Sequence, residues 1–399
     1  MRRAPSSSAS GSWPPSGSSW RRSSGSSVTG PLLCVWSAGL RCGVPPGIDA
    51  YPEGNSRNRR RAPVARGRAS LREHAGGADD RTDPDVDPRE GGSMPTAQPA
   101  IFNDMGEHQW YVHLSRTEGA DLATIKGVVR DLRAACADQD INLVLGFGPT
   151  LLADIGAEMP NDFQPFETIK STDGSGREAK GTQEELLFWM TSAHKDRNWK
   201  AQWDARQALK GHMAVARETI TFIYGASLDM TGFIDGTGNP QGEAAERAAA
   251  VVPDGEPGAG GSFINAQRWV HDLEAWEKLP VKEQEAVFGR TKAESTRLDE
   301  QPETSHVAHV ELREGATADA TKPKRDELVR RSTPYALHTG DVGLYFMAFC
   351  KTQAPLRERL RAMYGADGGV RDRLTDFSNP ASGSFYFAPS VEALDAGLR

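Results

Sequence analysis

Apolar and polar residues alternate in several short segments of the chain between residues 110 and 224. Alternation is typical of half-buried strands, and it predicts strands over residues 110–114, 141–148, 185–194 and 216–224. Between residues 121 and 136 the apolar positions instead recur every three or four residues, which predicts an amphipathic helix with Asp121 as its N-cap. Residues 196–211, rich in Ala, Lys and Gln, predict a second helix. The order, strand–helix–strand given twice, is the ferredoxin-like pattern.

A similar order recurs later in the chain. Strands are predicted over residues 262–269, 304–312, 341–350 and 384–388, with helical segments over residues 272–284 and 355–364. The Gly-, Ala-, Thr- and Lys-rich segment 313–325 is predicted to be a surface loop. We therefore predict the α+β class: two related halves, residues 94–225 and 226–399, with antiparallel sheets and peripheral helices.

Residues 1–93 have a different composition. They are rich in Ser, Gly, Pro and Arg, with fourteen arginines, no lysine and nine acidic residues, and they show no hydrophobic periodicity. The segment carries about +5, so about −12 of charge falls on the rest of a chain whose net charge is −7. Such a composition cannot offset chain entropy by burial. We expect a disordered tail, or translation upstream of the true start, with Met94 as the initiator.

An export signal is the second interpretation of this tail. Arg21 and Arg22 precede an apolar run at residues 31–40, the general order of a twin-arginine signal. The run is short and begins at Pro31, and no clear cleavage site follows it. No segment approaches the roughly 18 consecutive apolar residues that a membrane span needs. We expect a cytoplasmic location, with export as the alternative.

The cysteines and the negative charge of the body exclude further classes of protein. Of the four cysteines, only Cys136 and Cys350 lie outside the tail, and none forms a CxxC pair. This argues against a disulfide framework or a zinc site and favours a reducing compartment. An acidic body without a basic stripe gives no support to nucleic-acid binding.

One stretch, GFIDGTGNP at residues 232–240, contains a candidate catalytic residue, Asp235. It places Asp235 between glycines, which permit positive φ and close approach of the backbone to a bulky ligand. Phe233 and Ile234 make its surroundings partly apolar, and the Asn-Pro pair closes the turn. The arrangement suits a proton-transfer group that faces a flat ligand. Composition alone would favour a solvated aspartate on a surface loop.

This stretch resembles the GxxDG motif of the dye-decolourising (Dyp-type) haem peroxidases, and three further segments match that family in order. They are SFINAQRW at 262–269, PETSHV at 302–307 and VRRSTPY at 329–335, while FGRTK at 288–292 and GLYF at 343–346 also fit. The resemblance covers roughly residues 100 to 395 and is greatest to the bacterial cytoplasmic, YfeX-like branch. It implies a duplicated ferredoxin-like fold, barrel-like in arrangement, with haem in the second half.

The resemblance also implies roles for individual residues. His306 would be the proximal ligand of the haem iron, and Asp235 would be the distal acid–base group that shuttles a peroxide proton. Arg330, rather than its neighbour Arg331, would be the distal cation that stabilises charge as the O–O bond breaks. Ser332 would be a distal polar residue that holds a water molecule.

Several further assignments leave alternatives open. Asn239 matches a motif position close to the acid–base group and either supports the turn or contacts the cofactor. Asp376 is expected to accept a hydrogen bond from His306, and Arg268 pairs either with a haem propionate or with a structural carboxylate. His309 would point to the opposite face from His306 if both lie on a strand.

Together these roles imply a haem b peroxidase that reduces hydrogen peroxide and oxidises bulky organic compounds, such as dyes, phenols or porphyrinogens, by one-electron steps. The alternatives are a haem-handling protein, which transfers haem or releases its iron, and a haem-free ferredoxin-like binding module. The intact pair Asp235 and Arg330 favours the peroxidase, because storage needs only a pocket and His306. We also expect a homo-oligomer without nucleic-acid or membrane partners, and the sequence shows no encapsulin-targeting tail before Arg399.

Overall fold

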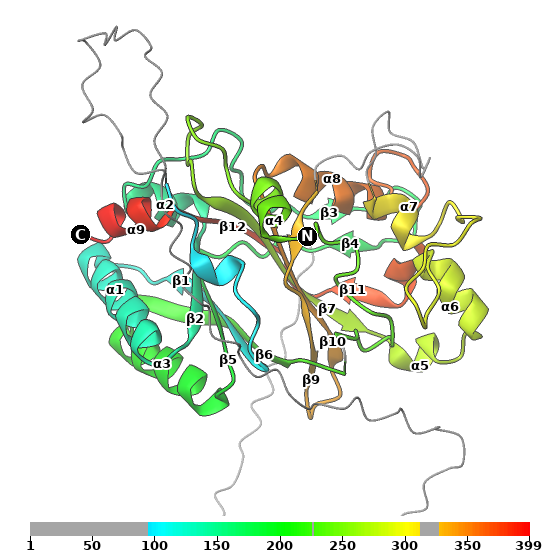
Figure 1. Cartoon of the computed structure of the whole chain (residues 1–399), viewed down its shortest axis with the longest axis horizontal. Coiled ribbons are helices and arrows are strands. Elements are labelled where there is room, and N and C mark those ends of the chain that lie inside the picture. Colours follow the sequence, from blue (N-terminus) through cyan, green and yellow to red (C-terminus); the bar gives the residue numbers. More distant parts are fainter. Residues whose placement is uncertain (1–94, 226, 312–326) are drawn as a thin grey trace, which may run out of the picture. The chain divides into compact units, whose positions relative to one another are not determined.

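A ten-stranded sheet forms the centre of the protein (Figure 1). The computed structural model describes residues 95–225, 227–311 and 327–399, so the tail and the predicted loop at 313–325 lie outside the described residues. The strands follow the order β6–β1–β5–β2–β12–β7–β10–β8, while β11 adds to β7 and β9 adds to β10. Neighbouring strands pair antiparallel. The predicted α+β class is confirmed.

The first half supplies one side of this sheet. Its strands are β1 (His108–Arg116), β2 (Asn142–Phe147), β5 (Leu186–Ser192) and β6 (Met213–Phe222). Its other elements are η1 (Pro99–Ile101), α1 (Leu122–Asp138), α2 (Pro149–Asp154) and α3 (Lys195–Ala208). Helices α1 and α3 pack on the outer face of these strands. Each predicted strand and helix is present, with ends shifted by a few residues.

The start of α1 follows the expected capping chemistry. The Asp121 carboxylate accepts hydrogen bonds from the backbone amides of Ala123 and Thr124. These amides lack partners inside the helix, so the cap fixes where the helix begins. On the inner face Ile125 and Val129 are fully buried against the sheet, as the spacing predicts.

The second half supplies the remaining strands of the sheet and most of the short helices. The strands are β7 (Ser262–His271), β8 (Val329–Arg330), β9 (Thr333–Ala336), β10 (Val342–Cys350), β11 (Ser378–Pro380) and β12 (Ser384–Ala388). The helices are α4 (Glu243–Ala250), α5 (Leu273–Trp276), α6 (Val281–Phe288), α7 (His306–Val310), α8 (Ala354–Met363), η2 (Arg373–Asp376) and α9 (Val391–Gly397). The helical segment predicted at 272–284 is two helices, because Pro280 separates them.

The strand predicted at residues 304–312 is wrong. Residues 306–310 form the helix α7, which packs against α8. Its two valines, Val307 and Val310, are three residues apart and lie on one face, a helical spacing that outweighs the strand propensity of valine. His306 therefore lies at the first position of a helix, where its ring can project beyond the helix end.

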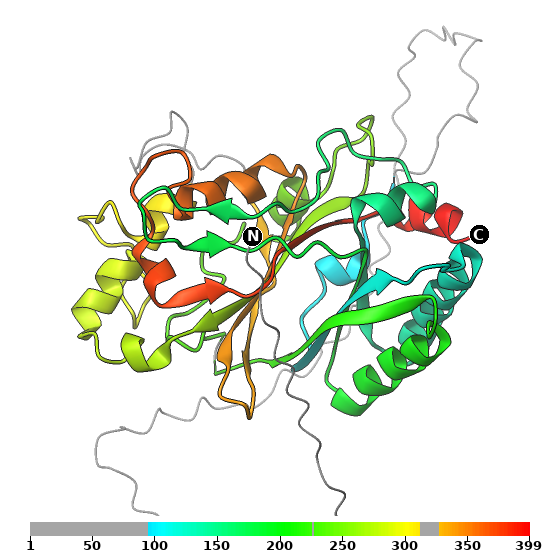
Figure 2. The ribbon, with the colours of Figure 1, turned by 180° about the vertical axis from the view of Figure 1, so that it is seen from behind.

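A hairpin of the first half reaches the second half. Strands β3 (Ile169–Lys170) and β4 (Glu178–Ala179) lie beside η2 and β11 in the view from behind (Figure 2). Arg177 donates to the Thr375 carbonyl at 2.6 Å, and Arg371 pairs with Asp173 at 2.8 Å. The hairpin thus holds the segment around residue 375 in place.

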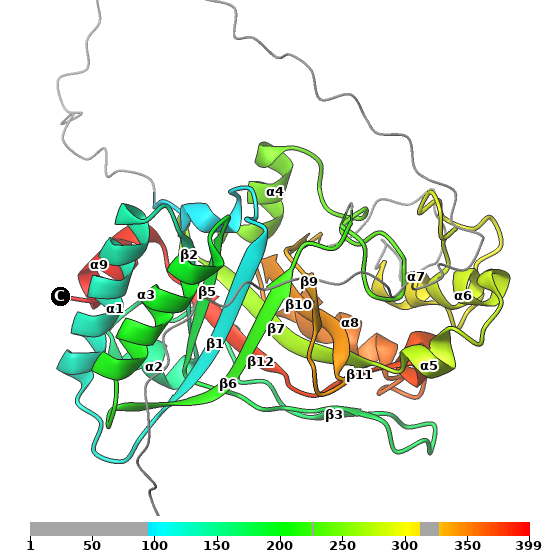
Figure 3. The same cartoon turned by 90° about the horizontal axis from the view of Figure 1, so that it is seen from below.

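The sheet curls until β6 comes close to β9, where the hydroxyls of Thr221 and Thr333 are 2.7 Å apart. The curl encloses an inner face that is packed with aromatic side chains, among them Tyr111, Trp189 and Tyr345. Figure 3 shows α1 and α3 outside the strands of the first half and α5 to α8 outside those of the second. The sheet therefore has an enclosed inner face and a second-half outer face that is available for a site.

The division into halves at residue 225 stays a prediction, although strands of the two halves adjoin through β2 and β12. The described residues belong to one compact unit. Within the described ranges, no helix combines the length and the apolar character needed to cross a membrane.

Candidate active site

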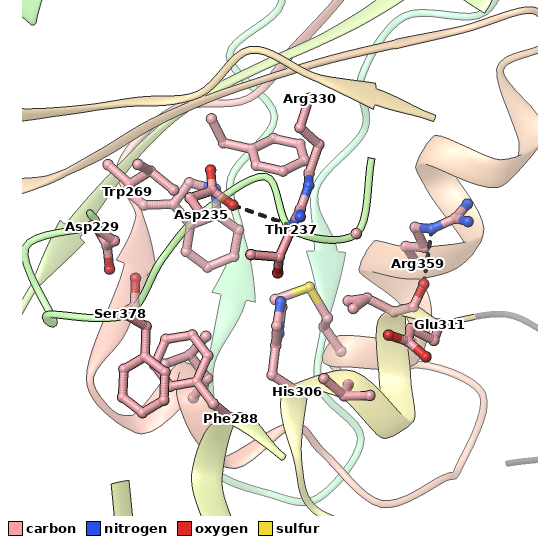
Figure 4. A pocket seen from close by; sticks show the side chains of 18 of the residues that line it. Asp229, Asp235, Thr237, Trp269, Phe288, His306, Glu311, Arg330, Arg359 and Ser378 are labelled. Carbon is pink, nitrogen blue, oxygen red and sulfur yellow. Dashed lines mark hydrogen bonds and ion pairs between the residues drawn. The ribbon is translucent and has the colours of Figure 1, made fainter. Parts of the chain in front are cut away.

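A cavity lies on the outer face of the second half, between strands β7 and β10 and helices α7 and α8 (Figure 4). Its walls are mainly apolar and include Phe233, Trp269, Phe288, Leu344, Phe346, Leu360 and Met363. A few polar side chains converge on it from opposite sides. Such a cavity suits a large flat ligand that is held by few polar contacts.

His306 enters the cavity from α7 (Figure 4). Its Nδ1 lies 2.7 Å from Oδ2 of Asp372, a side chain with no exposed surface. The other carboxylate oxygen of Asp372 accepts from the Leu374 amide at 2.8 Å, which fixes the carboxylate. A carboxylate on one ring nitrogen orients an imidazole and makes the other nitrogen a better metal ligand. His306 is thus prepared to bind a metal through Nε2.

Asp376, predicted to be this hydrogen-bond partner, does not contact His306. It pairs with Arg371 at 2.8 Å and with Arg177 at 3.3 Å. The reason is the turn η2, which begins after Asp372 and ends at Asp376, so that the two carboxylates point in different directions. Both Asp372 and Asp376 are evident in the sequence, and the geometry of the turn decides which of them bonds His306.

Asp235 and Arg330 face His306 from the other side of the cavity (Figure 4). Oδ1 of Asp235 is 3.3 Å from Nη1 of Arg330 and accepts from the Gly236 amide at 2.7 Å. Gly236 has a φ of +80°, a conformation that suits glycine and that turns the chain beside the carboxylate. A carboxylate and a permanent cation are therefore held together above an imidazole.

Asn239 does not line the cavity. Its side-chain amide donates to the Arg330 carbonyl at 2.9 Å, and its Oδ1 accepts from the Arg330 amide at 3.0 Å. This reciprocal pair joins the Asp235 turn to β8. Of the two roles left open for Asn239, the structure supports the positioning of the turn and of Arg330.

Replacing Asn239 with Ala should loosen the Asp235–Arg330 pair. Loss of two hydrogen bonds should lower the free energy of unfolding by about 1–3 kcal/mol, and the rate of reaction with peroxide should fall because Arg330 loses its anchor. Chemical denaturation and stopped-flow absorption measure the two effects. Gln241→Ala is the matched control, since that exposed amide bonds only the Asn239 carbonyl. Unchanged stability and rate in Asn239→Ala would remove the positioning role.

Ser332 and Arg268 also lie outside the cavity lining. The Ser332 hydroxyl accepts from the Met347 amide at 3.4 Å, so it contacts β10, and its predicted distal role stays a prediction. Arg268 pairs with Asp341 at 2.6 Å and bonds the Tyr335 hydroxyl at 3.2 Å. Residues of β7 alternate between faces, and the odd-numbered ones from 265 to 271 line the cavity, so Arg268 points away from it. The structural ion pair was the correct alternative.

Arg331 and His309 are likewise directed elsewhere. Arg331 pairs with Glu246 at 2.9 Å and bonds the Ile101 carbonyl at 3.0 Å, which agrees with the choice of Arg330 as the distal cation. His309 is buried, and its two ring nitrogens lie 2.8 Å from the carbonyls of Ser305 and Val370. Because α7 is a helix, His309 does not face opposite His306 as predicted, and its nitrogens are occupied by backbone groups.

Sequence reasoning missed two polar groups of the lining. The first is a chain in which His271 lies 3.0 Å from Asp229 and 2.8 Å from the Ser378 hydroxyl. Burial would raise the pKa of Asp229, but the charge and hydrogen bond of His271 outweigh it and lower that pKa. The second is Glu311, which pairs with Arg290 and with Arg297. Neither group forms a local sequence motif, because the members of the first are 42 and 107 residues from His271 and the partners of Glu311 are 14 and 21 residues from it.

Two atoms of the cavity wall have no partner among the described residues. Asn265 and Gln267 on β7 bond each other at 3.1 Å, but Oδ1 of Asn265 and Nε2 of Gln267 remain without a hydrogen bond. Both side chains are fully buried and line the cavity. Buried polar atoms are normally paired, so these two indicate that the cavity receives a group from outside the chain.

Fold and site together describe a haem-binding α+β peroxidase, and comparison with known proteins identifies the family. Residues 226–393 match the family model described as Dyp-type peroxidase, C-terminal. The dye-decolorizing peroxidase of Mycobacterium tuberculosis is 30% identical over 297 residues, which cover 71% of this chain and 86% of that protein. A variant of Rhodococcus jostii DypB, solved in complex with heme, superposes with a TM-score of 0.68 at 27% identity, covering 75% of this chain and 99% of that one.

The chain belongs to the Dyp-type peroxidase family and is a haem-dependent peroxidase. The haem-free binding module is therefore set aside. Escherichia coli deferrochelatase is also similar, at 26% identity over 217 residues that cover 48% of each chain.

The residues of the cavity fit haem. The apolar walls suit a porphyrin, and His306, bonded to the Asp372 carboxylate, suits its iron. The amide atoms of Asn265 and Gln267 that lack a partner among the described residues can bond a polar group of the cofactor. The cavity brings together the three residues predicted for iron binding and acid–base chemistry, which are His306, Asp235 and Arg330.

Proposed function

We propose that His306 binds the iron of haem b, and that Asp235 and Arg330 act on hydrogen peroxide on the opposite side. The observation that carries this is their placement: one imidazole, fixed by a buried carboxylate, faces a carboxylate–guanidinium pair across an apolar cavity. Haem supplies the redox centre that takes oxidising equivalents from peroxide and passes them on to reductants one electron at a time.

Asp235 and Arg330 would have different roles in the reaction with peroxide. The Asp235 carboxylate would accept a proton from one oxygen of hydrogen peroxide and return it to the other oxygen, which would leave as water. Arg330 keeps its charge and stabilises the negative charge that develops while the O–O bond breaks. The apolar walls strengthen both interactions because they exclude water.

The Asp372 carboxylate should govern the iron ligand. In Asp372→Asn the single amide oxygen can accept from either Nδ1 of His306 or the Leu374 amide but not from both, and the charge is lost, so haem affinity or peroxide reactivity should fall about 10- to 100-fold. Haem titration and stopped-flow absorption measure it. Asp376→Asn is the control, because within the described part of the chain that carboxylate pairs with Arg371 and Arg177 and not with His306. The reverse result, with Asp376→Asn perturbing the haem spectrum and Asp372→Asn silent, would restore the sequence-based assignment.

Bulky dyes and phenols are the proposed reductants. The cavity is sized and lined for the cofactor, and the Asp235–Arg330 pair leaves polar contacts suited to peroxide rather than to a dye. Electrons from large reductants would enter at the cofactor edge or through aromatic residues. Purified protein loaded with haem should oxidise a phenolic dye only when peroxide is added.

Haem handling is the second candidate, favoured by the similarity to deferrochelatase. Release of iron needs the cavity and His306 but not the distal pair. Incubation of haem-loaded protein with a reductant and an iron chelator separates the two activities. Iron-free porphyrin released without peroxide, together with no dye oxidation, would favour haem handling over the peroxidase.

We propose a cytoplasmic location and a homo-oligomer. The two cysteines of the described chain, Cys136 and Cys350, are buried free thiols, which suits a reducing compartment. Trp199 and Trp203 stack on the exposed face of α3, 46% and 41% exposed, and exposed aromatic surface favours association. Cell fractionation and light scattering of the full chain test these proposals.

A further inference from the structure

The enclosed inner face of the sheet contains a polar group that the proposed mechanism does not use. His113 of β1 lies at its centre, with Nε2 2.6 Å from the Tyr345 hydroxyl and Nδ1 2.7 Å from the Tyr386 hydroxyl. All three side chains are buried, none exposed by more than 1%. The three come from β1, β10 and β12, so only the curled sheet brings them together.

The protonation state of this group follows from its burial. Desolvation, with a smaller contribution from Arg217, lowers the pKa of His113 to about 3. Desolvation also raises the pKa of Tyr345 well above its usual value, and neighbouring Tyr386 and Tyr111 add to this. All three groups are therefore neutral at pH 7. A neutral imidazole has one protonated nitrogen, so one tyrosine donates its O–H to the ring and the other accepts.

Tyr345 is placed between this imidazole and the cofactor cavity. Its neighbours Leu344 and Phe346 line the cavity, while Tyr345 projects from the opposite face of β10. Strand β10 thus contributes side chains both to the cavity wall and to the inner face that holds the phenol. Tyr386 lies on β12, and neither it nor its sequence neighbours line the cavity.

Aromatic stacking extends from Tyr345 into the core. Its ring stacks on Tyr111 at 3.6 Å between centroids, and Tyr111 is parallel to Trp189 at 6.1 Å. The Tyr111 hydroxyl donates to the amide oxygen of Gln109 at 2.8 Å. An amide oxygen is a much weaker base than an imidazole nitrogen. Within this stack, Tyr345 is the residue with a base positioned to take its proton.

We propose that Tyr345 and His113 form a proton-coupled site that stores one oxidising equivalent derived from peroxide. The inference rests on the peroxidase function. Tyr345 gives one electron to the peroxide-oxidised cofactor, its O–H bond breaks, and the proton passes to Nε2 of His113, which is the unprotonated ring nitrogen when Nδ1–H donates to Tyr386. The products are a neutral tyrosyl radical and an imidazolium. When an electron from an external reductant reaches the tyrosyl radical, His113 returns the proton and the phenol is restored.

Burial gives this site a storage role rather than a substrate role. No external dye can touch Tyr345, so an equivalent held there is shielded from water and from random surface oxidation. The low basicity of His113 means that the imidazolium gives its proton back readily once the electron returns. The stack on Tyr111 and Trp189 adds neighbours through which the equivalent can move.

Freeze-quench electron paramagnetic resonance after one equivalent of peroxide tests the site in haem-loaded full-length protein. We expect a tyrosyl signal that narrows when tyrosine is ring-deuterated and that Tyr345→Phe abolishes, since phenylalanine keeps the ring but not the hydroxyl. Tyr364→Phe is the matched control, because Tyr364 is equally buried but its hydroxyl has no hydrogen-bond partner among the residues that the structure describes. The control should keep the signal.

A second variant tests the base. His113→Asn removes the imidazole, so the tyrosyl signal should be lost or moved, while circular dichroism and haem content report whether the barrel remains intact. An unchanged signal in Tyr345→Phe, or one that Tyr364→Phe removes, would overturn the proposal. If peroxide is consumed and dye oxidised but no tyrosyl radical forms, only this inference fails. If peroxide produces no spectral change at all, the peroxidase assignment of the distal pair fails first.

Discussion

Arg330→Leu should bind haem normally but react with hydrogen peroxide about 10²–10³-fold more slowly, the usual cost of removing one charge-stabilising group from an active site. The guanidinium is 3.3 Å from Asp235 and on the far side of the cavity from His306, so its loss spares the iron ligand. Leucine fills part of the volume without charge. Stopped-flow absorption at varied peroxide concentration gives the rate constant, and haem titration gives the affinity.

Arg331→Leu is the control for this experiment. It removes the neighbouring guanidinium, which pairs with Glu246 away from the cavity, so the peroxide rate should remain near that of the wild type even where the lost ion pair lowers the free energy of unfolding. Arg330→Leu combined with Asp235→Asn should cost less than the sum of the two single losses, because the residues act as a pair. A peroxide rate in Arg330→Leu within about threefold of the wild type, well under the expected loss, would show that charge stabilisation comes from another group.

The sequence predicted those parts of the site that are encoded within a few residues. GFIDGTGNP contains the glycine that turns the chain at Asp235, and VRRSTPY contains the cation on a short strand. The amphipathic spacing of α1 predicted its buried face, because a helix has one period and the sheet covers one side. Local chemistry was sufficient in each case.

The sequence did not predict which way side chains point once strands and turns are assembled. Arg268 was a candidate for the cofactor, but its place among the even-numbered positions of β7 turns it toward Asp341. The choice between Asp372 and Asp376 depends on one short turn, which the β3–β4 hairpin of the other half holds in place. These outcomes depend on register and on contacts between residues about 200 positions apart.

The contacts of His113 were even less predictable from the sequence. Its partners are 232 and 273 residues away in the sequence, and of the three only Tyr345 lies in a matched segment, GLYF at 343–346. Alternation predicted that β1 has a buried face, and a histidine on that face would be expected to break the apolar pattern. Closure of the sheet supplies two hydroxyls and makes the histidine acceptable there.

His306→Gln should give the largest loss of all, since it removes the proposed iron ligand. Replacement by Ala would leave the Asp372 carboxylate buried without its partner, and a loss of about 1–3 kcal/mol could be mistaken for failure to bind haem. Glutamine can still donate a hydrogen bond toward Asp372, so the fold should persist. We expect haem to be lost on gel filtration, or retained with a shifted Soret band and no reaction with peroxide.

Rescue by added imidazole tests the same assignment of His306 as the iron ligand. In His306→Gly the missing ring leaves space at the end of α7, and added imidazole should enter it, restoring the Soret band and part of the peroxide reaction. His309→Gln is the control on the same helix, because its nitrogens contact backbone carbonyls and it does not line the cavity. Haem binding unchanged in His306→Gln, or lost in His309→Gln but not in His306→Gln, would place the iron on another residue and would require the opposite side of the cavity to be reassigned.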